Sequence, residues 1–159
     1  MRLVGPTTQG LTLIELVVTM TLVAILAALT LPRYFSLQQK ARIAKAHALF
    51  GGVRSAAALA YAKVLVTNTG TSGPASITME GHPVDIIYGY PTANGTGIVA
   101  ALQLDTSAGR VTISGGNNNP GNTLTIDLAG GTAGQCSVFY TAPPAANQAP
   151  GASVAMTAC

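Results

Sequence analysis

The chain has 159 residues, of which 48% are hydrophobic and only 8% are charged, and its formal net charge is +3. This length supports one modest domain, and the small charge alone gives no argument for nucleic-acid binding. The sequence contains no P-loop, no Gly-x-Ser-x-Gly and no His-Glu-x-x-His motif. A weakly charged exterior rich in Thr, Ser, Asn, Gly and Ala suits subunit packing or adhesion, so a structural protein is favoured over an enzyme.

Residues 1–10 form a short polar leader, and an apolar run from Leu11 to Leu31 follows it. Twelve residues of that run are Leu, Ile or Val. As a helix the run would span roughly 31 Å, which is enough to cross the hydrocarbon core of a bilayer. The sequence therefore predicts a membrane-inserting helix over residues 11–32. A conventional secretory signal fits less well because no small-x-small cleavage site follows the run.

One acidic residue, Glu15, lies inside this apolar run, and no basic residue lies there with it. A lone carboxylate in hydrocarbon is costly, so it indicates a function and a partner group. The partner could be a group on another molecule or a new amino terminus created by cutting nearby. Cleavage after the small residue Gly10 would make Leu11 the first residue and Glu15 the fifth, and Pro32 would end the span.

This N-terminus resembles that of a type IV pilin. The resemblance rests on the leader ending in Gly10, the run from Leu11 to Val18 that contains Glu15, and the pair Pro32-Arg33. It implies that a prepilin peptidase cleaves after Gly10 and methylates the new amine of Leu11. It also implies that Glu15 neutralises the N-terminal amine of a neighbouring subunit in a filament. Two positions depart from the family pattern: Leu11 stands where Phe is usual, and Gln9 where a basic residue often precedes the glycine.

The continuation from Leu31 to Ala60 looks most like the mannose-sensitive haemagglutinin type of pilin. The resemblance implies a precursor held in the inner membrane, handled by an assembly platform, and then polymerised with copies of itself into an extracellular filament. The filament would serve adhesion, surface attachment or motility. Two alternatives stay open: a pseudopilin of a type II secretion system, and a DNA-uptake pilin. No cofactor or metal is expected, and nucleic acid is the less favoured partner.

Beyond the apolar run, residues 33–66 have the alanine content and apolar spacing of an amphipathic helix. Together the two segments would make a helix of about 55 residues, with Pro32 and Gly51-Gly52 as soft points. By resemblance, residues 24–32 are expected to lose helical order on assembly. The apolar stripe predicts a core contributed by Leu49, Val53, Leu59 and Val64.

Residues 67–159 are rich in turn residues and read as a globular β domain. The fold class is therefore α+β: a long N-terminal helix packed on a small antiparallel sheet. The turn-rich segment 68–76 is expected to be a connector, and Ile98 to Leu104 a short helix or a buried strand, of which the helix is favoured. The expected strands are Val84–Tyr90, Val111–Ser114, Leu124–Leu128, Ser137–Thr141 and Val154–Thr157.

Two cysteines, Cys136 and Cys159, bracket the last segment. The resemblance places this domain outside the cytoplasm, where two thiols most simply form a disulfide worth about 3 kcal/mol. The alternative is two free thiols in a reducing compartment, and a metal site is disfavoured because two distant cysteines supply too few ligands. The positive-inside rule, counted over the basic residues after Pro32, would give the opposite orientation, but the resemblance and the cysteines outweigh it.

The remaining polar residues give little support for catalysis. His47 on the helix and His82 beside Pro83 are better explained as solvated or capped side chains than as a base or ligand, and Asp85, Asp105 and Asp127 occur singly. Residues 94–96 form an Asn-Gly-Thr sequon, which a turn explains equally well. Six basic residues and no acid lie between Glu15 and Glu80, and a solvated helical face explains them better than a DNA-binding groove.

Overall fold

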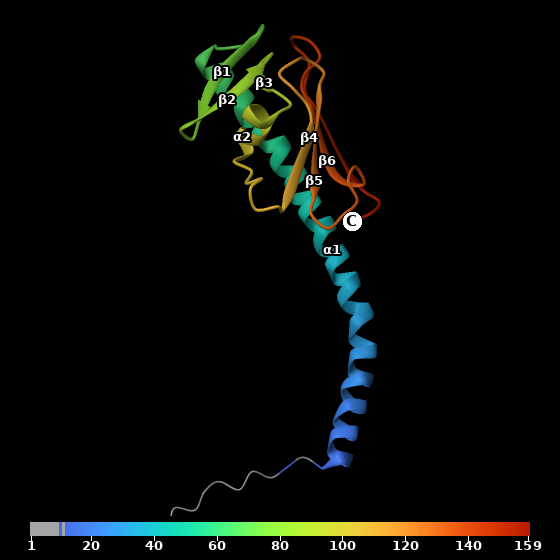
Figure 1. The fold of residues 1–159 in the computed structure, drawn as a ribbon. Coiled ribbons are helices and arrows are strands. Elements are labelled where there is room, and N and C mark those ends of the chain that lie inside the picture. The colour runs from blue at the N-terminus through green and yellow to red at the C-terminus, as the bar shows by residue number, and fades with distance from the viewer. Residues whose placement is uncertain (1–9, 11) are drawn as a thin grey trace, which may run out of the picture. The chain divides into compact units, whose positions relative to one another are not determined.

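The computed structural model describes Gly10 and residues 12–159. The chain divides into two compact units, residues up to Gln38 and residues from Gln39 to Cys159. A single helix, α1 (Leu13–Thr67), contributes to both (Figure 1). Its 55 residues confirm the long N-terminal helix, which passes through Pro32 and Gly51-Gly52 without a break in the helical assignment.

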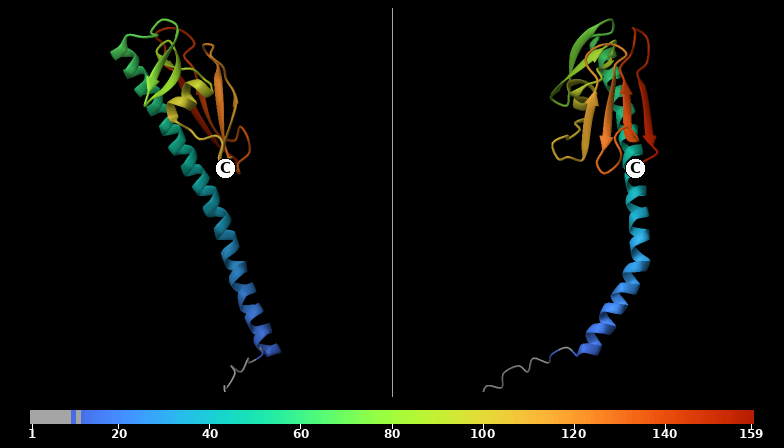
Figure 2. Two further views of the ribbon diagram at one scale, coloured as in Figure 1. Left: turned by 60° about the vertical axis from the view of Figure 1, so that its left-hand side comes forward. Right: turned by 45° about the vertical axis from the view of Figure 1, so that its right-hand side comes forward.

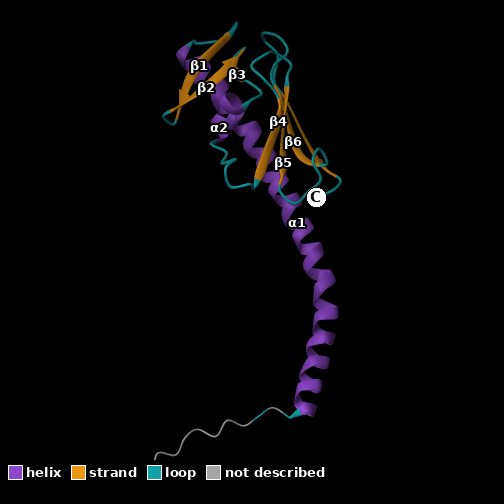
Figure 3. Cartoon of the chain, in the orientation of Figure 1, coloured by secondary structure: helices purple, strands orange, loops and turns teal. Residues whose placement is uncertain are grey.

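The second unit contains two antiparallel sheets in the described chain (Figure 3). The first has the order β1 (Pro74–Met79), β2 (His82–Ile87), β3 (Tyr90–Pro91). The second is a meander of β4 (Val111–Gly115), β5 (Thr123–Leu128), β6 (Cys136–Thr141) and β7 (Gly151–Met156). Two short helical segments, η1 (Gly95–Val99) and α2 (Ala100–Leu102), connect the sheets.

Successive turns of α1 between Ala46 and Val64 pack on different parts of this unit through buried residues that lie on one face of the helix. Ala46 contacts the cluster around Cys136 and Cys159. Val53 and Ala57 pack with residues of β5 and β6, and Ala60 and Val64 pack with those of β1 and β2. Figure 2 (left) shows the strands gathered on one side of this part of α1. The α+β fold predicted from the sequence is confirmed.

Several details of the sequence prediction were wrong. Leu59 is 63% exposed and not part of the core, because the buried stripe runs through Ala56 and Ala60 instead. Residues 74–79, expected to belong to a connector or left unassigned, form β1. The expected strand Val84–Tyr90 is cut after Ile87, where Tyr88 and Gly89 both adopt positive φ and turn the chain into β3. One sheet was expected, and the described residues form two.

The other elements differ from expectation mainly at their ends. The strand expected at Val154–Thr157 begins earlier, at Gly151. The helix expected from Ile98 begins at Gly95, where the side chain of Asn94 accepts a hydrogen bond from the Gly97 N–H at 2.7 Å and caps it. Gly97 itself lies against Thr92, so a Cβ at that position would collide with the Thr92 backbone.

Candidate assembly segment

The described residues of the first unit form an apolar surface with little burial. The large apolar side chains between Leu13 and Leu31 are exposed by 47% (Leu16) to 80% (Leu13). By length and composition, α1 is the one helix in the described chain that could cross a membrane, and none of its most apolar stretch is buried within the protein. Because such a surface is unfavourable in water, this segment needs lipid or other apolar helices around it.

The start of α1 is fixed by Thr12 and Glu15. The Glu15 backbone N–H donates to the Thr12 hydroxyl oxygen at 3.3 Å, and the Leu16 N–H donates to the Thr12 carbonyl oxygen at 3.1 Å. Thr12 therefore caps the helix, and Glu15 stands at the third helical position, as in the Thr-x-x-Glu capping box. This cap was missed from the sequence, although the motif itself was the available signal.

The position of Glu15 has an electrostatic consequence. Its carboxylate lies in the first turn of α1, where the partial positive charge of the helix end favours an anion. Its side chain is exposed, so an outside cation could reach it. The helix end alone cannot neutralise a full charge in hydrocarbon, and Glu15 remains the one acid among the described residues of this unit.

The threonine hydroxyls of the apolar segment form hydrogen bonds within the helix itself. The hydroxyls of Thr19 and Thr21 donate to the carbonyl oxygens three residues before them, each at 2.9 Å. The Thr30 hydroxyl donates to the Leu26 carbonyl at 3.0 Å. These bonds remove the cost of placing hydroxyls in lipid. Glu15 is thereby set apart as the group in this segment that requires something from outside.

Of the two residues expected at the processing site, Gly10 begins the described chain. Gly10 is exposed, and a Cβ added there would meet nothing within 4 Å. Leu11, the expected methylation site, lies outside the described residues. Pro32 lies inside α1, and the loss of helical order expected for residues 24–32 on assembly stays a prediction.

In the second unit, Cys136 and Cys159 form a disulfide with an S–S distance of 2.07 Å. Both cysteines are buried beside Ala46 of α1. The guanidinium of Arg42 donates to the Cys159 carbonyl oxygen at 2.9 Å and lies against Gly130. The disulfide thus joins the C-terminal residue to β6, and Arg42 joins it to α1.

The structure does not assemble the remaining polar residues into a reactive centre. Asp85 accepts a hydrogen bond from the Thr96 hydroxyl at 2.7 Å, Asp105 from that of Ser107, and Asp127 from that of Ser137. The Ser107 hydrogen bonds lower the pKa of the Asp105 carboxyl. Within the described residues, no three His, Cys, Asp or Glu side chains are grouped so as to hold a metal ion.

The sequon residue Asn94 is also engaged within the protein. Besides capping η1, its carbonyl oxygen accepts a hydrogen bond from the Thr92 hydroxyl, and its amide donates to Asn118. These hydrogen bonds give Asn94 a structural role in organising this turn.

In a comparison with known families, the Prokaryotic N-terminal methylation motif matches residues 6–31. No curated protein and no solved structure matches the chain. The matched residues include Gly10, Leu11 and Glu15, and they end immediately before Pro32. The motif, the membrane-capable helix and the disulfide support a type IV pilin-like or pseudopilin protein, with membrane insertion and processing by a prepilin peptidase.

Proposed function

We propose that this chain is a structural subunit of a type IV pilus. The precursor is stored in the inner membrane, cleaved after Gly10 and methylated on Leu11. An inner-membrane assembly platform then moves it into an extracellular filament of identical subunits. That filament serves adhesion, surface attachment or motility, and the chain itself catalyses no reaction.

The observation that carries the proposal is Glu15 in an otherwise apolar and exposed helix within the methylation motif. In a filament, apolar helices leave lipid for a shared core, which costs little because both surroundings are apolar. Pairing of Glu15 with the amine of Leu11 on a neighbouring subunit would then fix the axial register by charge. Thr12 caps the same turn, so the carboxylate and the start of the helix are held together.

One observation favours a surface pilus over a secretion pseudopilin: the strand and loop surface is built from Gly, Thr and Ser more than from charge. The C-terminal disulfide fits both candidates, because the periplasm is oxidising as well. Within the pili, the resemblance of residues 31–60 favours the mannose-sensitive haemagglutinin type. A DNA-uptake role is less favoured, because the Arg42 guanidinium already donates to the Cys159 carbonyl oxygen.

The experiment replaces Glu15 in the native host. Glu15→Leu is expected to insert in the membrane and lose its leader normally, but to give few or no shed filaments, since register is no longer specified. Glu80→Leu is the matched control, because it removes one acid from the exposed β1–β2 turn of the second unit. Filaments are counted by electron microscopy, and membrane-bound subunit is measured by immunoblot.

Wild-type numbers of filaments from Glu15→Leu would overturn the proposed role of the carboxylate. Absence of filaments from the native strain, together with secretion that depends on this chain, would instead favour the pseudopilin.

A further inference from the structure

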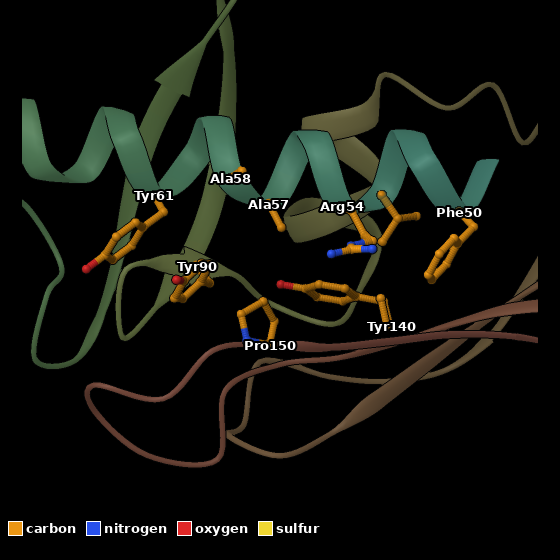
Figure 4. A pocket seen from close by; sticks show the side chains of 10 residues that line it. Phe50, Arg54, Ala57, Ala58, Tyr61, Tyr90, Tyr140 and Pro150 are labelled. Carbon is orange, nitrogen blue, oxygen red and sulfur yellow. The ribbon is translucent and has the colours of Figure 1, made fainter. Parts of the chain in front are cut away.

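One face of α1 lines an open groove in the second unit. Phe50, Arg54 and Tyr61 follow each other at helical spacing on this face and point toward Tyr140 and the β6–β7 loop (Figure 4). The cavity there has a volume of about 370 Å³. A second cavity of about 480 Å³ shares Tyr61 and adds Asn147 and Gln148 of the same loop. We call the two together the tyrosine groove, and each falls in the size range of small-ligand sites.

Two aromatic rings lie where the two cavities meet. Tyr61 and Tyr90 line both, and their rings stack with centroids 4.6 Å apart and planes within 6°. Stacking holds both rings in place, and Tyr61 is 36% exposed. Burial, followed by the electrostatic effect of the nearby Tyr61, raises the pKa of the Tyr90 hydroxyl, so the Tyr90 phenol stays neutral around pH 7. The groove thus offers a rigid aromatic surface with hydroxyls at its edge.

The groove also carries a positive charge. Arg54 is exposed, and its guanidinium carbon lies 5.7 Å from the centre of the Phe50 ring. Such a cation–π contact restricts the side chain before any ligand arrives, which lowers the entropy lost on binding. No Asp or Glu is among the residues that line either cavity in the described chain. Arg54 is therefore the charge that a ligand in the groove would meet.

We propose that the tyrosine groove binds a carboxylate-bearing sugar ring, such as a terminal residue of an acidic glycan. The apolar face of the ring packs on the tyrosines, and the carboxylate pairs with the Arg54 guanidinium through charge-assisted hydrogen bonds. The ring hydroxyls bond to the amides of Asn147 and Gln148, which a flat aromatic acid could not use. This inference goes beyond the proposed pilus role, since the site lies within a single copy of the chain.

Binding is measured on the full-length protein in micelles of a zwitterionic detergent, because glucoside or maltoside headgroups would compete. The probes are N-acetylneuraminic acid and methyl glucuronide, with methyl glucoside and benzoate for comparison. Saturation-transfer NMR from the tyrosine rings reports contact with sugar protons, and titration gives the dissociation constant. The two acidic sugars are expected to bind saturably at millimolar concentrations, and at least about tenfold more tightly than methyl glucoside or benzoate.

Three variants separate the contributions of the Arg54 charge and of the Tyr61 ring to sugar binding. Arg54→Gln is expected to weaken binding of the acidic sugars at least about tenfold and to leave methyl glucoside unchanged. Tyr61→Leu, which leaves Tyr90 without its stacking partner, is expected to remove saturation transfer to every sugar, and far-ultraviolet circular dichroism checks that the variant stays folded. Lys63→Gln is the matched control, because it removes the same charge from α1 at a residue that lines neither cavity.

Three results would overturn the proposal: no saturable binding of either acidic sugar, benzoate binding as tightly as they do, or equal losses in Arg54→Gln and Lys63→Gln. None of these depends on whether filaments form.

Discussion

Tyr140 is the largest fully buried side chain in the described structure, and it joins the two sheets. It lies on β6, and its hydroxyl donates to the carbonyl oxygen of Pro91 in β3 at 2.8 Å. Burial, and secondarily the nearby Tyr90, raises the pKa of the Tyr140 phenol above its ordinary value of 10.0. The neutral, donating form is therefore the one that the fold stabilises.

This shift predicts a pH dependence of stability. The contribution of a group with a raised folded pKa is fully present below its unfolded value and is lost as pH rises above about 10. The free energy of unfolding of the full chain in micelles, followed by tyrosine circular dichroism in guanidinium, should fall above that pH. Tyr140→Phe should be less stable by about 1 kcal/mol at neutral pH and should show a shallower alkaline decline. An equally steep decline in the variant would contradict this role of Tyr140.

Position 116 requires glycine for two reasons, the backbone conformation there and the lack of room for a side chain. Its φ is +72°, and a Cβ at this position would collide with the carbonyl oxygen of Ala93. Gly116→Ala should therefore lower the free energy of unfolding by about 2 kcal/mol or more. Gly73→Ala is the control, because its Cβ would meet nothing within 4 Å and its φ is not positive. Equal stabilities of the two variants in a urea titration would rule out this constraint.

At the scale of elements, the disulfide and Arg42 hold the C-terminal residues against β6 and α1. The sequence separation of 23 between the cysteines predicts a contribution of about 3 kcal/mol. We expect the double replacement Cys136→Ser and Cys159→Ser to lower the free energy of unfolding by that amount, and Arg42→Met by about 1 kcal/mol.

The losses in free energy of unfolding from Arg42→Met and from the double serine variant should not add, because Arg42 and the disulfide both order the C-terminal residues. Combining Arg42→Met with the double serine variant should therefore cost less than the sum of the separate losses. Lys45→Met provides the comparison, since Lys45 is an exposed cation one turn along the same helix. Full additivity in the denaturation curves would mean that Arg42 acts independently of the disulfide.

The elements differ in how well the sequence predicts them, for physical reasons. The apolar run and alanine-rich continuation predict α1 because the helical period persists over many turns. By contrast, β1 was missed because only Ile77 of its six residues is fully buried and Pro74 begins it, so its sequence resembles a loop. The turn at Tyr88-Gly89 was missed because a tyrosine at positive φ is rare. Leu59 was misassigned because alanines on the adjoining turns let the helix approach the domain more closely.

At the scale of the whole molecule, the sequence predicts one of the two candidate sites, the assembly segment, better than the other, the tyrosine groove. The assembly segment is continuous in sequence, so Gly10, Glu15 and Pro32 could be chosen from the residues themselves and from the resemblance to type IV pilins. The tyrosine groove is formed by α1, β3, β6 and the β6–β7 loop, which are distant in sequence. The spacing of Phe50, Arg54 and Tyr61 shows a shared helix face, but only tertiary structure brings Tyr90 and Tyr140 to it.

The stability of the molecule is also unevenly distributed. The three buried clusters belong to residues from Gln39 onward, whereas the described apolar residues before Gln38 have no core of their own. The second unit can therefore fold and form its disulfide before the first unit finds its final surroundings. Processing at Gly10 and oxidation of Cys136 and Cys159 should be separable events, which intact mass can test.

Protein purified from the native membrane or filament should lack residues 1–10, carry one methyl group on Leu11, and be lighter by the two hydrogens lost in the Cys136–Cys159 disulfide. Gly10→Val should retain the leader and lack the methyl group. It should still form the Cys136–Cys159 disulfide and so lack its two hydrogens, because a Cβ at position 10 contacts no atom within 4 Å. Gly5→Val provides a control within the leader. Native protein that keeps its first ten residues would contradict the processing, whereas reduced cysteines in the correctly cleaved protein would contradict the extracellular placement of the second unit.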